Sequence, residues 1–346
     1  MYRVRPVTGP DEQWDGKSIL NTENDAGKMK PVTRQTHRLP AWLSLAVMAC
    51  VMLVPPPAWG LTAVQLTTPD EGTPGPLVSV DWLAEHLQDS SIVLLHVGMP
   101  TARASGEFIP GARFLNYQEI VQVRDSLIVE MPTIDELIEP LEVAGVSDGA
   151  MIILYGNPAH LPARAYVTLD YLGLGAQTAV LDGGLEAWKA TEHPVVAIPA
   201  QGPRGLFTPI VRDDVLVSAE WIEERLYDPT VALIDSRPEG EYNGSVPIRI
   251  GGRAGHIPGA RNLYWEDLLV APENPVLLDF TDVQLQFVNA GADYGAIVVN
   301  YCYVGMRASY TYLIAKHLGY DARLYDGSWN EWSKNDSLPA VTSPQP

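Results

Sequence analysis

Cys302 lies in a segment whose residue types and spacing could support nucleophilic chemistry at sulfur. The segment reads VVNYCYVGMRAS at residues 298–309: an apolar run ends at the cysteine, Gly305 follows three residues later, and Arg307 precedes a run without helix breakers. This order predicts a strand, a tight loop and a helix. Backbone N–H groups of such a loop, together with the positive end of the helix dipole, would favour a thiolate. A buried structural cysteine at a strand end is the alternative interpretation.

Three motifs around this loop occur twice in the chain, in the same order. The segment LVSVDWLAEHL at 77–87 matches LVSAEWIEERL at 216–226, IPGAR at 109–113 recurs at 257–261, and LDGGLEAW at 181–188 matches YDGSWNEW at 325–332. The chain therefore contains two copies of one domain. Short apolar runs alternate with amphipathic stretches in each copy, which predicts an α/β fold with a parallel sheet flanked by helices on both faces.

We expect the two domains at residues 74–192 and 213–340, joined by a linker at 193–212 that is rich in Pro and Gly. A chain of 346 residues with 46% hydrophobic content has material for two such domains. In place of the cysteine loop, the first copy has residues 156–162, which we expect to form a longer loop without a thiol. The second domain is then the catalytic one, and the first is a non-catalytic partner that walls one side of the site.

Residues 1–60 are expected to be a leader that is removed from the mature protein. The run from Ala41 to Val54 is apolar and uncharged, follows basic residues and precedes PPPAWG, which is typical of a secretory signal peptide cut near Gly60. A start at Met29 would give a purely basic leader, and we expect translation to begin there. The protein would then be periplasmic or secreted. An uncleaved leader would instead anchor it to a membrane.

Net charge and cysteine content narrow the possible partners. The formal net charge is −19, which argues against sequence-independent binding of nucleic acid and means that a small anion needs a local positive site, such as Arg307. The chain has two cysteines, and Cys50 lies in the expected leader. Cys302 would be the only thiol of an exported protein, so no internal disulfide could form, and the thiol would be either buried or in use.

The tandem copies and the cysteine loop together resemble the tandem-domain rhodanese family of thiosulfate and 3-mercaptopyruvate sulfurtransferases. The resemblance extends from about Leu77 to Trp332 and is carried by GHIPGA at 255–260, the six-residue loop CYVGMR, and the closing YDGSWNEW. It implies that only the second domain is catalytic and that Cys302 forms a persulfide. No metal or organic cofactor is implied. The cradle for the outer sulfur would consist of Tyr303, Val304, Gly305, Met306 and Arg307.

The function that this resemblance implies is transfer of a sulfane sulfur from thiosulfate to cyanide or a thiol acceptor. The loop matches neither substrate class of the family, because Tyr303 and Val304 follow the cysteine. Glu241 stands where many tandem members have an arginine, although Arg249 and Arg253 could compensate. We favour thiosulfate, with Arg307 pairing with its oxyanion. The alternatives are a 3-mercaptopyruvate sulfurtransferase, or a persulfide carrier that passes sulfur to a protein without turnover.

Loop length argues against a cysteine phosphatase or an arsenate reductase. Phosphatases with this kind of fold place five residues between cysteine and arginine, which makes room for a tetrahedral phosphate. Only four residues separate Cys302 from Arg307 here. The smaller ring suits a single bound sulfur atom.

Three further residues are expected to support the site. Asp235 and Arg237 follow an apolar run, and we expect them to form an ion pair that fixes this strand end beside the cysteine loop. Arg237 is also a candidate substrate contact. His256 precedes a Pro-Gly turn, so we expect it to stabilise the turn and not to act as a base.

Intact-mass measurement of the protein recovered from its native host tests the expected leader. We predict a mass that corresponds to a chain beginning near residue 61. A mass that includes the apolar run 41–54 would contradict removal of the leader.

Overall fold

The computed structural model describes residues 74–104, 106–246 and 252–342, and every structural statement below concerns these residues. The expected leader and Arg249 lie outside them. None of the helices in these ranges is both long and apolar enough to cross a bilayer.

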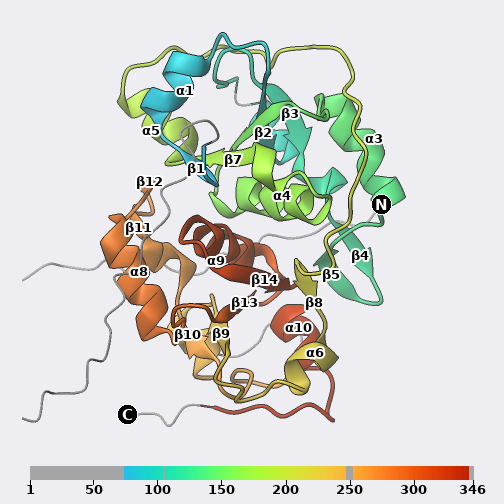
Figure 1. Ribbon diagram of the computed structural model, residues 1–346, viewed down its shortest axis with the longest axis vertical. Helices are drawn as coiled ribbons and strands as arrows, with labels where there is room; N and C mark the ends of the chain where they lie inside the picture. Colours follow the sequence, from blue (N-terminus) through green and yellow to red (C-terminus); the bar gives the residue numbers. More distant parts are fainter. Residues whose placement is uncertain (1–73, 105, 247–251, 343–346) are drawn as a thin grey trace, which may run out of the picture. The chain divides into compact units, whose positions relative to one another are not determined.

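Each copy of the repeat folds around its own five-stranded parallel sheet (Figure 1). The first sheet has the order β1-β7-β6-β2-β3 and the second has the order β8-β14-β13-β9-β10, so strands at equivalent sequence positions take equivalent places. This confirms the expected duplication and the expected parallel pairing. The first sheet comprises β1 Leu77–Val78, β2 Ile92–Gly98, β3 Arg113–Asn116, β6 Met151–Tyr155 and β7 Thr178–Leu181. The second comprises β8 Leu216–Val217, β9 Val231–Asp235, β10 Arg261–Asn262, β13 Ile297–Tyr301 and β14 Asp321–Tyr325.

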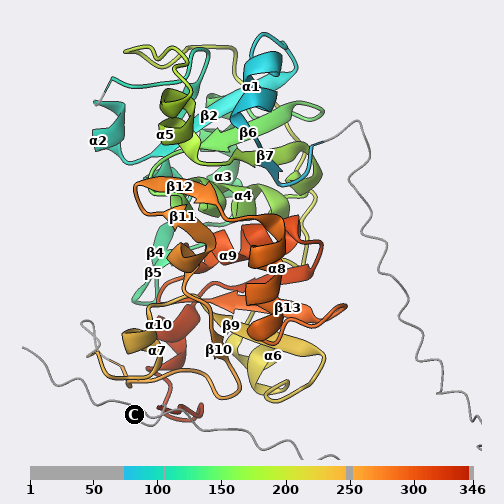
Figure 2. The same cartoon turned by 90° about the vertical axis from the view of Figure 1, so that its left-hand side faces the viewer.

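Helices cover both faces of each sheet, as expected (Figure 2). Adjacent strand residues point to opposite faces: Leu94 packs in one apolar cluster and Leu95 in another. The first copy has α1 Val80–His86, α2 Pro100–Arg103, α3 Ile134–Ala144, α4 His160–Tyr171 and α5 Gly184–Ala190. The second has α6 Ala219–Glu223, α7 Glu239–Tyr242, α8 Phe280–Asn289, α9 Met306–His317 and α10 Ser328–Trp332. Short 3₁₀ helices lie at Tyr117–Glu119, Gly175–Gln177 and Trp265–Leu268.

The repeated Ser-x-x-Trp segment starts a helix in each copy for the same reason. The hydroxyl of Ser79 accepts a hydrogen bond from the Trp82 N–H, and that of Ser218 accepts one from the Trp221 N–H. An N-cap serine satisfies one of the backbone donors that a helix leaves free at its start. The repeated sequence therefore forms the same N-cap hydrogen bond in both copies.

The two copies pack through α4 and α9, and one apolar cluster continues from one sheet to the other. Each copy also holds the end of a β-hairpin of the other. Asp326 accepts a hydrogen bond from the Met131 N–H (2.7 Å), just after β4 Gln122–Arg124 and β5 Leu127–Glu130. Asp182, at the matching position, accepts one from the Leu277 N–H (2.9 Å), at the end of β11 Leu269–Ala271 and β12 Asn274–Leu277. The aspartate of the repeated Asp-Gly motif thus joins the domains.

Arg164 of the first copy forms a buried ion pair with Asp326 of the second. Its side chain has 0% exposure, and both terminal nitrogens donate to the carboxylate, while Nη2 also donates to the Val129 carbonyl at 2.9 Å. Burial disfavours the charged guanidinium, but the negative charge of Asp326 outweighs burial and raises the pKa of Arg164. A charge with this burial is stable only while its partner is present.

The expectation of a longer loop in the first copy is wrong. Four residues, 156–159, separate β6 from α4, and four, 302–305, separate β13 from α9. Pro162 does not extend the loop because it lies in the first turn of α4, where a missing N–H leaves no helical hydrogen bond unmade. Gly156 therefore occupies the position of Cys302 in a loop of equal length.

Replacing Arg164 with methionine (Arg164→Met) tests the interdomain pair. The change leaves the Asp326 carboxylate buried without its cation, so we expect the free energy of unfolding in urea to fall by about 3 kcal/mol. Lys189→Met is the matched control, because Lys189 pairs with Glu107 at a solvent-exposed site, and we expect a loss below about 1 kcal/mol. Equal losses in the two variants would contradict the assignment.

Candidate active site

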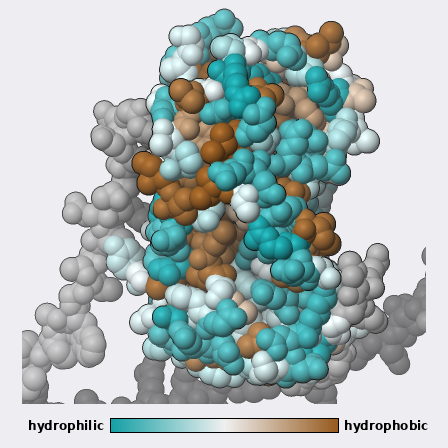
Figure 3. All heavy atoms as spheres, turned by 90° about the vertical axis from the view of Figure 1, so that its right-hand side faces the viewer, coloured by the Kyte–Doolittle hydropathy of each residue, from teal (hydrophilic) through white to brown (hydrophobic). Residues whose placement is uncertain are grey.

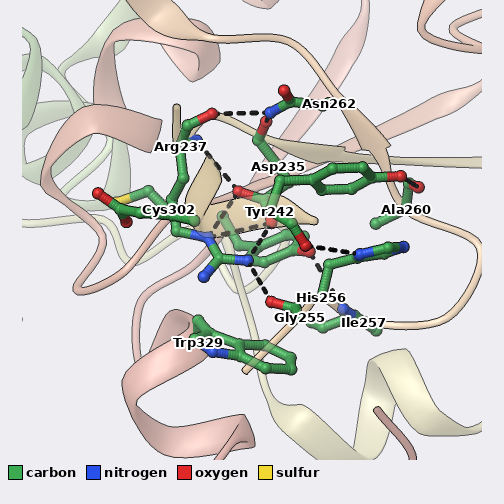
Figure 4. Close-up of polar contacts among 12 residues, drawn as sticks. Asp235, Arg237, Tyr242, Gly255, His256, Ile257, Ala260, Asn262, Cys302 and Trp329 are labelled. Carbon is green, nitrogen blue, oxygen red and sulfur yellow. Dashed lines mark hydrogen bonds and ion pairs between the residues drawn. The ribbon is translucent and has the colours of Figure 1, made fainter. Parts of the chain in front are cut away.

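Cys302 is the first residue after β13, and the helix α9 begins four residues later. Its neighbour Tyr301 pairs in register with Asp235 at the end of β9. Carboxyl ends of parallel strands meet at one sheet edge, so Cys302 and Arg237 leave neighbouring strands side by side (Figure 4). The predicted strand, loop and helix are confirmed.

The cysteine loop is held from behind by the turn that follows β14. The hydroxyl of Ser328 accepts hydrogen bonds from the N–H groups of Cys302 (3.2 Å) and Gly305 (3.0 Å) and donates to the Tyr325 carbonyl (2.8 Å). The Trp329 N–H donates to the Cys302 carbonyl at 3.0 Å. The closing YDGSWNEW signature therefore fixes the loop. Sequence reasoning treated this signature as a mark of the family and missed the role of Ser328.

Gly305 is required by the shape of the loop. Its φ is +78°, and a Cβ there would lie 2.7 Å from Oδ1 of Asp326. Such a φ strains any side chain, and that contact is closer than carbon and oxygen tolerate. Among the described residues, no carbonyl or side chain accepts a hydrogen bond from the backbone N–H groups of Tyr303, Val304, Met306 and Arg307. These N–H groups are the donors that the sequence predicts for the cradle.

Cys302 is a free thiol with 0% exposed surface. This burial agrees with the alternative of a buried structural cysteine at a strand end, and it departs from the exposure that a reactive thiol would need. The loop residues above it are only partly buried, Tyr303 and Met306 among them. A reacting compound therefore reaches the sulfur only when side chains at this rim move.

Arg307 forms an ion pair with Glu241 of α7. Its Nη1 lies 3.0 Å from Oε1 and its Nη2 lies 2.8 Å from Oε2. Burial disfavours the charge, but the hydrogen bonds to Glu241 and the proximity of Cys302 together raise the pKa of Arg307. The sequence predicted that this guanidinium would pair with the oxyanion of a donor. In the structure its two terminal nitrogens hold a carboxylate of the chain itself.

Arg237 and Asp235 form the ion pair that the sequence predicts. Both side chains have 0% exposure, with 2.6 Å between Arg237 Nη2 and Asp235 Oδ2, and Nη2 also donates to the Gly255 carbonyl at 2.8 Å. The guanidinium lies 5.0 Å from the ring centre of Trp329 (Figure 4). Its Nη1 has no hydrogen-bond partner in the described part of the chain, and neither has the hydroxyl of Tyr303. Two buried donors near the thiol are thus unpaired.

Among the residues that the structure describes, His256 contacts Tyr242 of α7 and not the Pro-Gly turn itself, so its role in stabilising the turn stays a prediction. Its Nδ1 lies 2.8 Å from the Tyr242 carbonyl, and its ring stacks on the Tyr242 ring at 3.8 Å (Figure 4). Burial lowers its pKa. Arg253, considered as a compensating cation, instead donates to carbonyls of residues 332–338. The position of Arg249 is outside the described residues.

Two residues of the first copy reach the cysteine loop, and sequence reasoning missed both. The Tyr117 hydroxyl donates a hydrogen bond to Sδ of Met306 at 2.8 Å. The ring of His160 lies edge-on to Trp265 at 5.2 Å, and burial, aided by the charge of Arg307, lowers its pKa to about 4. His160 is therefore uncharged at neutral pH. No pattern in the sequence marks these contacts, because their partners lie more than 100 residues away.

The residue set around Cys302 suits covalent chemistry at sulfur. Within the described ranges, no group of three or more His, Cys, Asp and Glu side chains could hold a metal ion. The loop and its surroundings offer one thiol, several free backbone donors and two arginines that are already paired, of which Arg237 is buried and Arg307 is partly exposed.

Comparison with known proteins identifies similar chains. A family model described as the rhodanese-like domain matches residues 79–191 and 218–335. The 3-mercaptopyruvate sulfurtransferase of Escherichia coli (strain K12) is 28% identical over 275 residues, which cover 76% of this chain and 96% of that protein. The sulfur carrier protein TtuD of Thermus thermophilus is 28% identical over 283 residues, or 77% of this chain and 96% of that protein.

Two further matches extend this comparison. A putative thiosulfate sulfurtransferase of Haloferax volcanii is 27% identical over 284 residues, covering 76% of this chain and 95% of that protein. The crystal structure of the 3-mercaptopyruvate sulfotransferase SseA from Escherichia coli has a TM-score of 0.65 and 25% sequence identity, covering 74% of this chain and 99% of that chain.

Ser328→Ala tests the hydrogen bonds that hold the loop. Two buried N–H groups lose their acceptor, so we expect the free energy of unfolding to fall by about 2 kcal/mol and Cys302 to react faster with iodoacetamide. Ser333→Ala is the matched control, because the Ser333 hydroxyl is buried but has no hydrogen-bond partner among the described residues. We expect its stability to change by less than about 1 kcal/mol. If Ser328→Ala behaves like Ser333→Ala, the hydroxyl does not fix the loop.

Proposed function

The chain belongs to the rhodanese-like domain family, and from this premise we propose that it transfers sulfane sulfur through a persulfide on Cys302. The similar proteins named above are sulfurtransferases and a sulfur carrier, so sulfur transfer is the activity class of its relatives. The observation that carries the proposal is the loop of residues 302–305. It places one thiol beside backbone N–H groups that no group of the described chain uses.

The first step would load the enzyme with sulfur. The thiolate of Cys302 attacks the outer sulfur of thiosulfate, an S–S bond to the enzyme forms, and the S–S bond of thiosulfate breaks as sulfite leaves with the electron pair. In the second step a nucleophile such as cyanide attacks the outer sulfur of the persulfide. The enzyme S–S bond then breaks, thiocyanate leaves, and the electron pair returns to Cys302 as a thiolate. The scheme is ping-pong and balances without an external oxidant.

The free donors near the thiol would stabilise negative charge on the outer sulfur. Backbone N–H groups fixed in place before the reaction cost no reorganisation when charge develops. The unpaired Nη1 of Arg237 and the Tyr303 hydroxyl are further donors without an acceptor. The outer sulfur of a persulfide anion would be an acceptor for these donors.

The choice of donor remains a proposal. Thiosulfate was favoured because Arg307 would pair with its oxyanion, but Arg307 is paired with Glu241. The geometry therefore gives thiosulfate no advantage over 3-mercaptopyruvate, and relatives named for each compound are similar to this chain. We keep thiosulfate as the proposed donor because it is the smaller of the two, and the thiol is reached only past partly buried side chains.

A persulfide carrier is the second candidate. The full burial of Cys302 favours it, because a buried persulfide would be protected from solvent until a protein acceptor displaces the side chains at the rim. The Thermus thermophilus relative is named as a sulfur carrier. A burst of one sulfur per chain without steady turnover would identify a carrier, whereas continued turnover would identify an enzyme.

We also propose that the protein acts outside the cytoplasm, in the periplasm or after secretion. The proposal rests on the sequence of residues 29–60.

Cys302→Ser tests the proposed nucleophile. We expect the unmodified protein to gain the mass of one sulfur atom on incubation with thiosulfate and to form thiocyanate when cyanide is added. The Cys302→Ser variant should gain no sulfur and form thiocyanate only at the uncatalysed rate, since serine forms no persulfide. The full-length Cys50→Ser variant, which keeps Cys302 alone, is the control and should retain sulfur uptake. Uptake by Cys302→Ser would overturn the assignment.

A further inference from the structure

The Glu241–Arg307 pair is partly exposed. The side chain of Glu241 is 31% exposed and that of Arg307 is 22% exposed. Each carboxylate oxygen accepts one hydrogen bond from Arg307. A carboxylate oxygen has two acceptor sites, so each can still accept another hydrogen bond. Both terminal nitrogens of Arg307 donate to this carboxylate, so the pair has no net charge.

Glu241 lies close to the loop that would hold the persulfide. Burial raises the pKa of Tyr303, and the negative charge of Glu241 raises it further. Arg307, the partner of Glu241, has its pKa raised in part by the proximity of Cys302. The carboxylate therefore borders the side chains that a compound passes on its way to the sulfur.

Two other ion pairs near the site lie in the protein interior. Arg237 and Asp235 neutralise each other in the interior, as do Arg164 and Asp326. His160 is uncharged at neutral pH, because its pKa is lowered to about 4. Among these pairs, the Glu241–Arg307 pair is the one in which both side chains are partly exposed.

We propose that Glu241 is a specificity-determining residue that makes the Cys302 persulfide favour acceptor thiols with an ammonium group over acceptor thiols with an anionic group. The inference deepens the proposed persulfide chemistry and rests on it. An anion can pair with both terminal nitrogens of Arg307 in the geometry that Glu241 now uses only if Glu241 gives up two charge-assisted hydrogen bonds. An ammonium group can use the free acceptor sites of Glu241 without breaking either bond. The substrate class is a small aminothiol.

In the selective step, an aminothiol is the sulfur acceptor. Its thiolate attacks the outer sulfur of the Cys302 persulfide and forms a new S–S bond. The bond between the two enzyme-bound sulfurs breaks, and the electron pair returns to Cys302 as a thiolate. The product is the persulfide of the aminothiol, and no oxidant or reductant is consumed.

Three thiols of similar size and different charge test the proposal. The full chain is first loaded with sulfur from inorganic polysulfide. Then kcat/KM for sulfur release is measured with cysteamine, 2-mercaptoethanol and 3-mercaptopropionate. The measured quantity is the ratio of the cysteamine value to the 3-mercaptopropionate value. Comparing this ratio between variants cancels the intrinsic reactivity of each thiol and any general loss of activity.

In Glu241→Gln the ratio should fall by about tenfold, because the ammonium loses its partner and Arg307 becomes free to attract the carboxylate. Glu239→Gln is the matched control, since Glu239 lies on the same helix α7, is exposed, and has no ion-pair partner among the described residues. Its ratio should stay within about twofold of the unmodified protein.

Each outcome decides between the alternatives. An unchanged ratio in Glu241→Gln, with sulfur transfer intact, overturns the specificity role and leaves the proposed function standing. Absence of persulfide from the unmodified protein, whatever the donor, overturns both. If Glu241→Gln does not fold, Glu241→Ala removes the same charge, and the charge-conserving Glu241→Asp should keep the preference for cysteamine. Loss of that preference in Glu241→Asp would count against the charge of residue 241 as its cause.

Discussion

The turn Asp326–Ser328 joins the domain interface to the cysteine loop, and the rest of the site depends on it. The Asp326 carboxylate binds Arg164 and the Met131 N–H of the first domain. Two residues later, the Ser328 hydroxyl binds the cysteine loop through two of its N–H groups. The loop lies directly against the interdomain pair, since a Cβ on Gly305 would be 3.3 Å from Arg164 Nη1. The packing of the two domains against each other and the shape of the cysteine loop therefore depend on the same set of contacts.

Duplication explains why a domain without a thiol keeps its structure. The hydroxyl of Tyr155 accepts a hydrogen bond from the Ile109 N–H, and that of Tyr301 accepts one from the Ile257 N–H, so both copies retain the same internal contact. The first copy also supplies Tyr117 to the wall of the second copy's site. The first copy, which has Gly156 where the second has Cys302, thus still contributes a side chain to the surroundings of that cysteine.

Neutralised ion pairs set the electrostatics of the site. The buried Asp235–Arg237 pair satisfies its own charges, so its main contribution is to position the strand end beside the loop. Glu241 and Arg307 form a partly exposed pair in which the carboxylate accepts a hydrogen bond from each terminal nitrogen of the guanidinium. Positive charge near a thiol is therefore not the same as positive charge available to a ligand. The backbone donors of the loop are the groups that remain free for the sulfur.

The sequence by itself determined the duplicated parallel-sheet fold, the strand-loop-helix around Cys302, and the Asp235–Arg237 pair. These features depend on local patterns: periodicity, glycine at a positive φ, and two residues at one strand end. Only the tertiary structure decided that Cys302 is buried, that Arg307 binds Glu241, and that Tyr117 reaches Met306. Those contacts join residues 66 and 189 positions apart. Periodicity carries no information about such pairs, because which side chains meet depends on how the sheets and helices pack.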